Sequence, residues 1–208
     1  MNKIMRLVFI GTFTLALINS SAQDKFTTYD RTYGDPETYD IEISTKEKNG
    51  DFKLYINAWS LDATHKKGGI GITKKQYPDF INAINEAKVK YEEWVKTAKD
   101  NNVKELSKQM DIKCKVSGNF IYGKDWHFQF TVNPTFNFKI IEDESDLKYL
   151  LIFRTGELTS SSNQYMKVDG FALVFTSTAE IDAFTKAISI EAIDEFIKKP
   201  KEKDLFKN

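Results

Sequence analysis

Two blocks of alternating apolar and polar residues, each followed by a stretch with helical spacing, constrain the fold of this chain most. The first block runs over 39–58, and the second lies within 112–175. Alternation with period two predicts half-buried strands, whereas apolar spacings of three and four predict a helix with one core-facing side. The order predicts an α+β fold, in which two related units of antiparallel strands followed by a helix pack as one domain.

The two helices are marked by their apolar positions. The first is expected to begin just before Pro78, because proline is tolerated only in the first turn of a helix. The second is expected to run without a break over 178–198. The core-facing positions of the helices are Phe80, Ile84, Ala87, Tyr91, Trp94, Val95 and Ala98 in the first, and Ile181, Phe184, Ile188, Ala192 and Phe196 in the second.

The segment before the first strand block has a different composition. Residues 23–38 contain Gly34 and Pro36 and predict a loosely ordered segment.

The starts of the two helices resemble each other. Residues 73–84 align without a gap to residues 177–188. Both segments open with a hydroxyl residue and place Gln or Glu three positions later, which is the spacing of a capping box. Both then carry Phe, Ala and Ile at equivalent positions. The chain is therefore expected to hold a duplicated unit, with the first copy at 23–110 and the second at 111–208.

The aromatic residues of the second block alternate most strongly over 126–132. Trp126, Phe128 and Phe130 fall on one side of the expected strand, and His127 falls on the other. We expect the aromatic side to pack against a helix, which places His127 on the surface. A ligand cavity lined by these rings, together with those of Phe136 and Phe138, is the alternative.

The first residues have the pattern of a secretory signal peptide. Lys3 and Arg6 precede an uncharged stretch at 7–18, which is too short to span a bilayer, and the small residues at 20–22 suit a signal peptidase. Residues 1–22 are therefore expected to be removed, and no cysteine follows the cut to carry a lipid. The sequence predicts a periplasmic or secreted protein with no transmembrane segment in the mature chain.

Charge and cysteine content narrow the classes of partner. The chain has 30 Lys+Arg and 30 Asp+Glu, so no overall field attracts polyanions. Arg31 and Arg154 are the only arginines after the leader, which disfavours arginine-based phosphate recognition.

Cys114 is the only cysteine, so an internal disulfide is excluded. We expect it to be buried and unreactive.

Part of the first unit is similar to a known family. Residues 39–94 resemble the strand–strand–strand–helix unit of the single-stranded-DNA-binding coactivator positive cofactor four, whose plan Whirly and Pur-alpha proteins share. The resemblance rests on a hairpin around Asn49-Gly50, on Trp59 near the end of the second strand, and on the segment 66–73 before the helix. It implies that fold and the binding of unpaired bases on a sheet face. The long strands of the second half and the extended first helix depart from the family pattern.

A candidate binding face follows from the outward positions of the second strand and the basic segment after it. Its residues are Lys53, Tyr55, Asn57, Trp59, Lys66 and Lys67. We expect a non-catalytic, exported protein that binds a protein, peptide or glycan. Binding of single-stranded nucleic acid outside the cytoplasm is the alternative, and an enzyme that uses scattered carboxylates ranks third.

No pattern in the sequence supplies a known catalytic or metal site. Zinc sites need several Cys, His or carboxylate ligands at close spacing, and the chain has two histidines, His65 and His127, and one cysteine. No catalytic motif is present. The acidic cluster 142–146 is expected to form a charged hairpin tip rather than a calcium loop. We therefore expect no enzyme activity, no metal and no cofactor.

Overall fold

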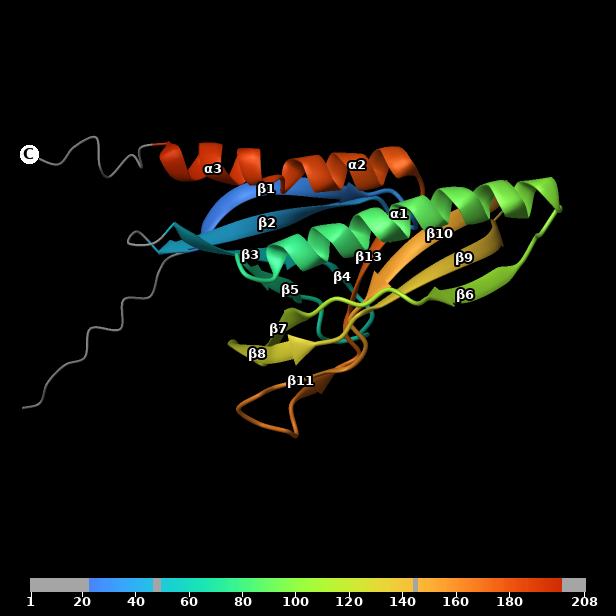
Figure 1. Ribbon diagram of the computed structural model, residues 1–208. Coiled ribbons are helices and arrows are strands. Elements are labelled where there is room, and N and C mark those ends of the chain that lie inside the picture. Colours follow the sequence, from blue (N-terminus) through green and yellow to red (C-terminus); the bar gives the residue numbers. More distant parts are fainter. Residues whose placement is uncertain (1–22, 47–49, 144–145, 200–208) are drawn as a thin grey trace, which may run out of the picture.

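The computed structural model describes residues 23–46, 50–143 and 146–199, in which strands and helices form a mixed α+β protein (Figure 1). Six strands form a first sheet in the order β1, β2, β3, β5, β7 and β8, and five form a second sheet in the order β4, β13, β10, β9 and β6. Every strand pair is antiparallel. The predicted α+β class with antiparallel strands is confirmed.

The first sheet contains β1 (Asp24–Arg31), β2 (Glu37–Lys46), β3 (Asp51–Asn57), β5 (Gly68–Thr73), β7 (Val116–Tyr122) and β8 (Asp125–Val132). The second contains β4 (Trp59–Ser60), β6 (Leu106–Met110), β9 (Thr135–Asp143), β10 (Asp146–Arg154) and β13 (Phe171–Phe175). A small hairpin consists of β11 (Leu158–Thr159) and β12 (Lys167–Val168). The helices are α1 (Tyr77–Asp100), α2 (Thr178–Ala187) and α3 (Ile190–Lys198).

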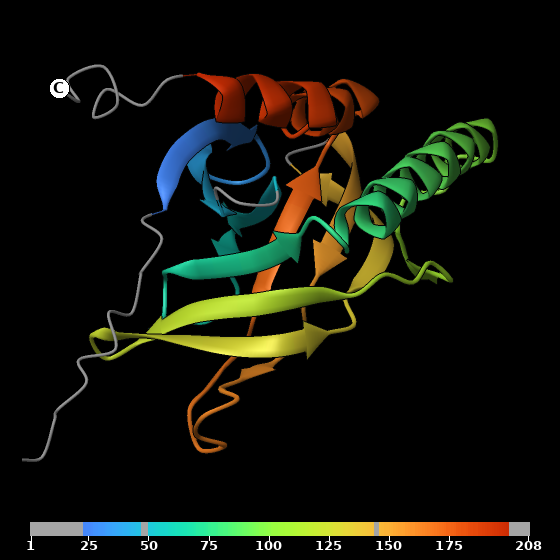
Figure 2. The same cartoon turned by 60° about the vertical axis from the view of Figure 1, so that its left-hand side comes forward.

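Strands from both parts of the sequence share each sheet. In the first sheet, β7 follows α1 in the chain and pairs with β5, which precedes it. In the second sheet, the short strand β4 pairs with β13, close to the end of the fold. Figures 1 and 2 show the helices on one side of the strands, with the β11–β12 hairpin on the other side. Each sheet therefore contains strands that precede α1 and strands that follow it.

The core lies where the apolar sides of the sheets meet the stripe of α1. Phe80 is fully buried and contacts the ring of Phe153 edge-on, with the ring centroids 5.9 Å apart. The hydroxyl of Tyr91 donates to the carbonyls of Tyr149 and Thr176, which ties α1 to β10 and to the start of α2. The helix begins at Tyr77 with Pro78 in its first turn, as predicted. Most of the predicted stripe is buried, and Trp94 and Val95 are half-buried.

The N-terminal segment is more ordered than its composition suggests. Residues 24–31 form the edge strand β1, which pairs with β2, so the expectation of a loose segment over 23–38 was wrong for this part. The rings of Tyr29 and Tyr39 stack at 5.4 Å, and Arg31 donates to the carbonyls of Tyr33 and Asp35. The strand pairing, the stacked rings and these local bonds outweigh the polar composition.

Two other boundaries differ from the prediction. The expected continuous helix at 178–198 is two helices, because the hydroxyl of Ser189 caps α3 by accepting from the amide of Ala192. Ile193 is the buried residue of α3, while Ala192 and Phe196 are half-buried. Residues 111–115 alternate in burial but belong to no sheet, and β7 begins only at Val116.

The leader at 1–22 and the turn residue Asn49 lie outside the described residues. No described helix is long and apolar enough to cross a membrane.

Candidate binding face and cleft

The strand β8 presents its aromatic side to solvent. Trp126 is 46% exposed and Phe130 is 73% exposed, while Phe136 and Phe138 on β9 are fully buried. The expectation that all these rings pack in the core was therefore correct for β9 and wrong for β8. The face of β8 that was expected to be exposed is instead partly covered, because His127 lies half-buried against the ring of Phe120.

The segment 158–168 explains this reversal. The amide of Thr159 donates to the side-chain oxygen of Gln129 at 2.7 Å, and His127 lies within hydrogen-bond distance of the Ser160 hydroxyl. The amide of Ser161 donates to the carbonyl of Phe128 at 2.8 Å along the strand edge. Polar side chains of β8 thus find partners on the inner side, which leaves the aromatic side outward.

Strand register places these rings on the same side as the predicted binding residues. Asn57, Gly69, Asn119 and Phe128 are paired in succession across β3, β5, β7 and β8, so their side chains share one face of the sheet. Alternation adds every second residue on these strands. We call this the aromatic face, and its members are Lys53, Tyr55, Asn57, Asn119, Trp126, Phe128 and Phe130.

Glycines in β5 allow a lysine to lie flat across this face. A Cβ at Gly71 would lie 2.7 Å from Cε of Lys53, so the absence of a side chain there makes room for the lysine. The Nζ of Lys53 lies 4.7 Å from the ring centroid of Tyr55 and 5.8 Å from that of Phe128. The Lys53 ammonium is therefore held between rings from β3 and β8.

The structure brings together only part of the candidate site. Lys53, Tyr55 and Asn57 lie on the aromatic face, as predicted. Trp59 belongs to β4 in the second sheet, where its ring lies 4.8 Å from the guanidinium carbon of Arg31.

The lysines before β5 are also separate from Lys53. Lys66 and Lys67 precede the end of β5 that pairs with Asn57, while Lys53 pairs with Thr73 at the opposite end. Lys66 donates to the carbonyl of Asp62.

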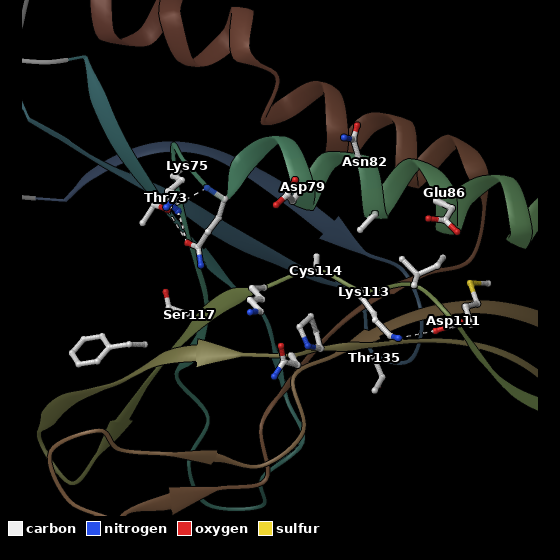
Figure 3. Close-up of a pocket in the computed structure, with 18 of the residues that line it drawn as sticks. Thr73, Lys75, Asp79, Asn82, Glu86, Asp111, Lys113, Cys114, Ser117 and Thr135 are labelled. Atoms are coloured by element: carbon white, nitrogen blue, oxygen red, sulfur yellow. Dashed lines mark hydrogen bonds and ion pairs between the residues drawn. The ribbon is translucent and has the colours of Figure 1, made fainter.

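A cleft of about 1140 Å³ adjoins the aromatic face. Figure 3 shows Asp79 and Glu86 on α1 and Asp111 and Lys113 on the segment that faces the helix. Four lysines, three carboxylates, four side-chain amides and three hydroxyls line the cleft. It shares Lys53 with a second cavity of about 550 Å³. Small-molecule pockets usually measure about 300–1000 Å³, so the combined space suits an extended ligand.

The carboxylates of the cleft are spread out. Asp79 and Glu86 are separated by about two helical turns, which is an axial rise of roughly 10 Å. Asp111 lies 3.5 Å from the ammonium of Lys113. Within 23–46, 50–143 and 146–199, no group of three or more His, Cys, Asp or Glu residues could hold a metal ion.

Cys114 lies in the wall of the cleft and is 7% exposed. Burial, with a smaller contribution from the charge of Asp79, raises the pKa of its thiol to about 12. The thiol therefore keeps its proton at neutral pH. A protonated thiol is a poor nucleophile and a poor metal ligand, because the thiolate is the reactive form. The predicted burial of Cys114 is confirmed.

This raised pKa predicts a loss of stability at alkaline pH. The unfolded thiol has a pKa near 9.0 and ionises first, so the folded state binds more protons above that pH. We expect the free energy of unfolding to fall by up to about 1.4 kcal/mol per pH unit between pH 9 and 11 from this residue. Urea unfolding of the native protein and Cys114→Ala at pH 7–11 isolates this contribution. A difference between the two proteins that does not change with pH would contradict the assignment.

No protein-family model matches the chain, and no curated protein or solved structure is significantly similar to it. The resemblance to positive cofactor four, Whirly and Pur-alpha proteins therefore stays a prediction. The site is defined by its own geometry: an open aromatic sheet face that continues into a polar cleft.

Proposed function

We propose that this protein is an exported, non-catalytic binding protein that holds a glycan chain along the aromatic face and the adjoining cleft. One observation carries the proposal: the rings of Phe128 and Phe130, which Trp126 extends along the strand, are continuous with the cleft, because Phe130 and Lys53 line both. Isolated exposed aromatic residues are common, but a row beside a large polar cleft is typical of a binding surface.

The chemistry of the surface suits sugars. One side of a sugar ring presents C–H groups that pack on an aromatic ring, while its hydroxyls need donors and acceptors around the rim. The cleft supplies side-chain amides from Gln76, Asn82, Gln109 and Asn133 and hydroxyls from Thr73, Ser117 and Thr135. The near balance of lysines and carboxylates disfavours a densely charged polymer.

A peptide is a weaker candidate for this surface. Extended peptides commonly add a strand to an open sheet edge, where main-chain hydrogen bonds supply the affinity. At β8 this edge is engaged, because Phe128 accepts from the Ser161 amide and the amide of Phe130 donates to the Ser161 hydroxyl. A ligand that binds through its ring faces needs no free edge.

Export and duplication are part of the same proposal. The pattern of residues 1–22 supports removal of a leader, and recovery of the native protein with Met1 attached would contradict it. The similar placement of the buried rings Phe80 and Phe184 supports a duplicated unit. The bonds at the two helix starts differ in position: Gln76 accepts from the amide of Thr73 in the turn before α1, whereas Ser177 caps α2 by accepting from the amide of Glu180.

Single-stranded nucleic acid is the second candidate, and one observation favours it. An ammonium between two aromatic rings, as at Lys53, could pair with a phosphate while bases stack on Phe128 and Phe130. Binding that weakens steeply with salt would support this candidate. The balance of charge in the cleft opposes it, because Asp79, Glu86 and Asp111 offset the three lysines that line the cleft besides Lys53.

Phe130→Ala tests the proposal. We expect the variant to lose at least about tenfold in affinity for a retained oligosaccharide, because one ring of the stacking row is removed. The measurement is binding of the chain from Gln23 to an oligosaccharide array, followed by calorimetric titration of the retained ligands. Its melting temperature should stay unchanged, because the ring is mostly exposed.

Tyr165→Ala is the matched control. Tyr165 is 83% exposed, lies between β11 and β12, and lines neither the aromatic face nor the cleft. It should bind glycan as the native protein does. The proposal fails if no oligosaccharide is retained, or if Phe130→Ala and Tyr165→Ala lower the affinity equally.

A further inference from the structure

The ammonium of Lys53 is half-buried without a negative partner. Its side chain crosses Gly71 and ends between the rings of Tyr55 and Phe128. No carboxylate of the described chain forms an ion pair with it. Burial lowers the pKa of this amine, which is the direction expected for a cation that lacks compensation. An anion supplied by a ligand would compensate it with a charge-assisted hydrogen bond.

A second group on the same face also lacks a partner. Asn119 is 4% exposed, and its Oδ1 accepts no hydrogen bond from the described residues. It lies between Gly69 and Phe128 in the cross-strand register. Buried polar atoms without a partner are uncommon and costly. Asn119 lines neither the cleft nor the second cavity, so this buried oxygen is a cost within the sheet face rather than a ligand contact.

Charge counting indicates which anion fits. Lys53 offers one positive charge, and a carboxylate carries one negative charge, whereas a phosphate monoester carries nearly two. Apart from Lys53, three lysines and three carboxylates line the adjoining cleft, so it adds no net positive charge for a polymer with closely spaced negative charges. A sugar ring that bears a single carboxylate combines the anion, the apolar ring face and the hydroxyl donors.

We infer that this site selects glycans that contain a uronic acid, an inference that rests on the proposed function. The sugar carboxylate pairs with the Nζ of Lys53, and the sugar ring lies against Phe128 and Phe130. Lys53 is the residue that determines specificity, while the aromatic rings supply affinity for acidic and neutral sugars alike.

The test compares two ligands: an oligosaccharide with a single uronic acid residue, and the same oligosaccharide with that carboxyl group methyl-esterified. The native protein should bind the acid at least about tenfold more tightly than the ester. Lys53→Met keeps the alkyl chain over Gly71 and removes the charge. It should bind the acid no more tightly than the ester, because the loss of affinity for the acid exceeds any loss for the ester. Lys53→Arg should retain most of the preference, and unchanged melting temperatures should show that both variants are folded.

The outcomes separate this inference from the proposed function. Equal affinity of the native protein for acid and ester would overturn the inference and leave glycan binding intact. Equal losses for both ligands in Lys53→Met would also overturn it. If neither oligosaccharide binds but an oligothymidylate of ten nucleotides does, both the proposed glycan function and the inference fail, and the nucleic-acid candidate replaces them.

Discussion

Replacing Phe80 with alanine is expected to lower the free energy of unfolding by about 3–5 kcal/mol, which is the usual cost of removing a fully buried phenyl ring. Phe80 is 0% exposed and lies where α1 meets the second sheet, with its ring edge-on to that of Phe153. The deletion removes apolar contacts and leaves a cavity between helix and sheet that rigid strands cannot fill. Urea unfolding followed by circular dichroism measures the change.

Phe130→Ala is the control for this prediction, because the same chemical change is made at a ring that is 73% exposed. Its effect on stability should stay within about 0.5 kcal/mol. The two substitutions therefore separate rings that hold the fold from rings that face solvent. Comparable losses of stability in both variants would contradict the outward orientation of β8.

Gly69→Ala is expected to cost about 2–3 kcal/mol, the second largest effect on stability. A Cβ at Gly69 would lie 1.9 Å from the carbonyl oxygen of Ile56, and a backbone oxygen within a paired strand cannot move independently. The strands β3 and β5 would have to separate locally. Because Lys53 and Tyr55 lie on β3 and Phe128 lies beyond β5, we also expect weaker ligand binding.

Gly123→Ala is the matched control for Gly69→Ala. Nothing lies within 4 Å of a Cβ at Gly123, but its φ of +66° is unfavourable for alanine, at a cost of about 1–2 kcal/mol. Glycan binding should be unchanged in this variant, because Gly123 lies in the turn between β7 and β8. If Gly69→Ala were no less stable than the native protein, the close approach of β3 and β5 would be wrong.

Periodicity predicted the helix and the strands that have one apolar side and one polar side. In α1 the apolar spacing gave the buried side, and Pro78 gave the start. In β3, alternation gave the buried residues Phe52, Leu54 and Ile56 and hence the outward positions of Lys53 and Tyr55. These predictions succeed because a helix or strand that contacts one core layer repeats its burial with its own period.

Two of the remaining errors have physical causes that lie outside local patterns, and one has a local cause. Both sides of β8 carry large side chains, and its orientation is decided by segment 158–168, which supplies partners for His127 and Gln129. Trp59 continues the spacing of β3, but the chain changes sheets after Asn57. The capping role of Ser189 was available in the sequence, since serine is a favoured N-cap residue.

The exchange of strands between the sheets affects how the chain acquires its structure during synthesis. The first sheet stays incomplete until β7 and β8 emerge from the ribosome, and β4 has no strand to pair with until β13 follows. Pairings between distant segments form slowly, because the intervening chain must first be ordered. A nascent chain would therefore remain unfolded until most of it exists, which is the condition a protein needs if it is threaded through a membrane channel before it folds.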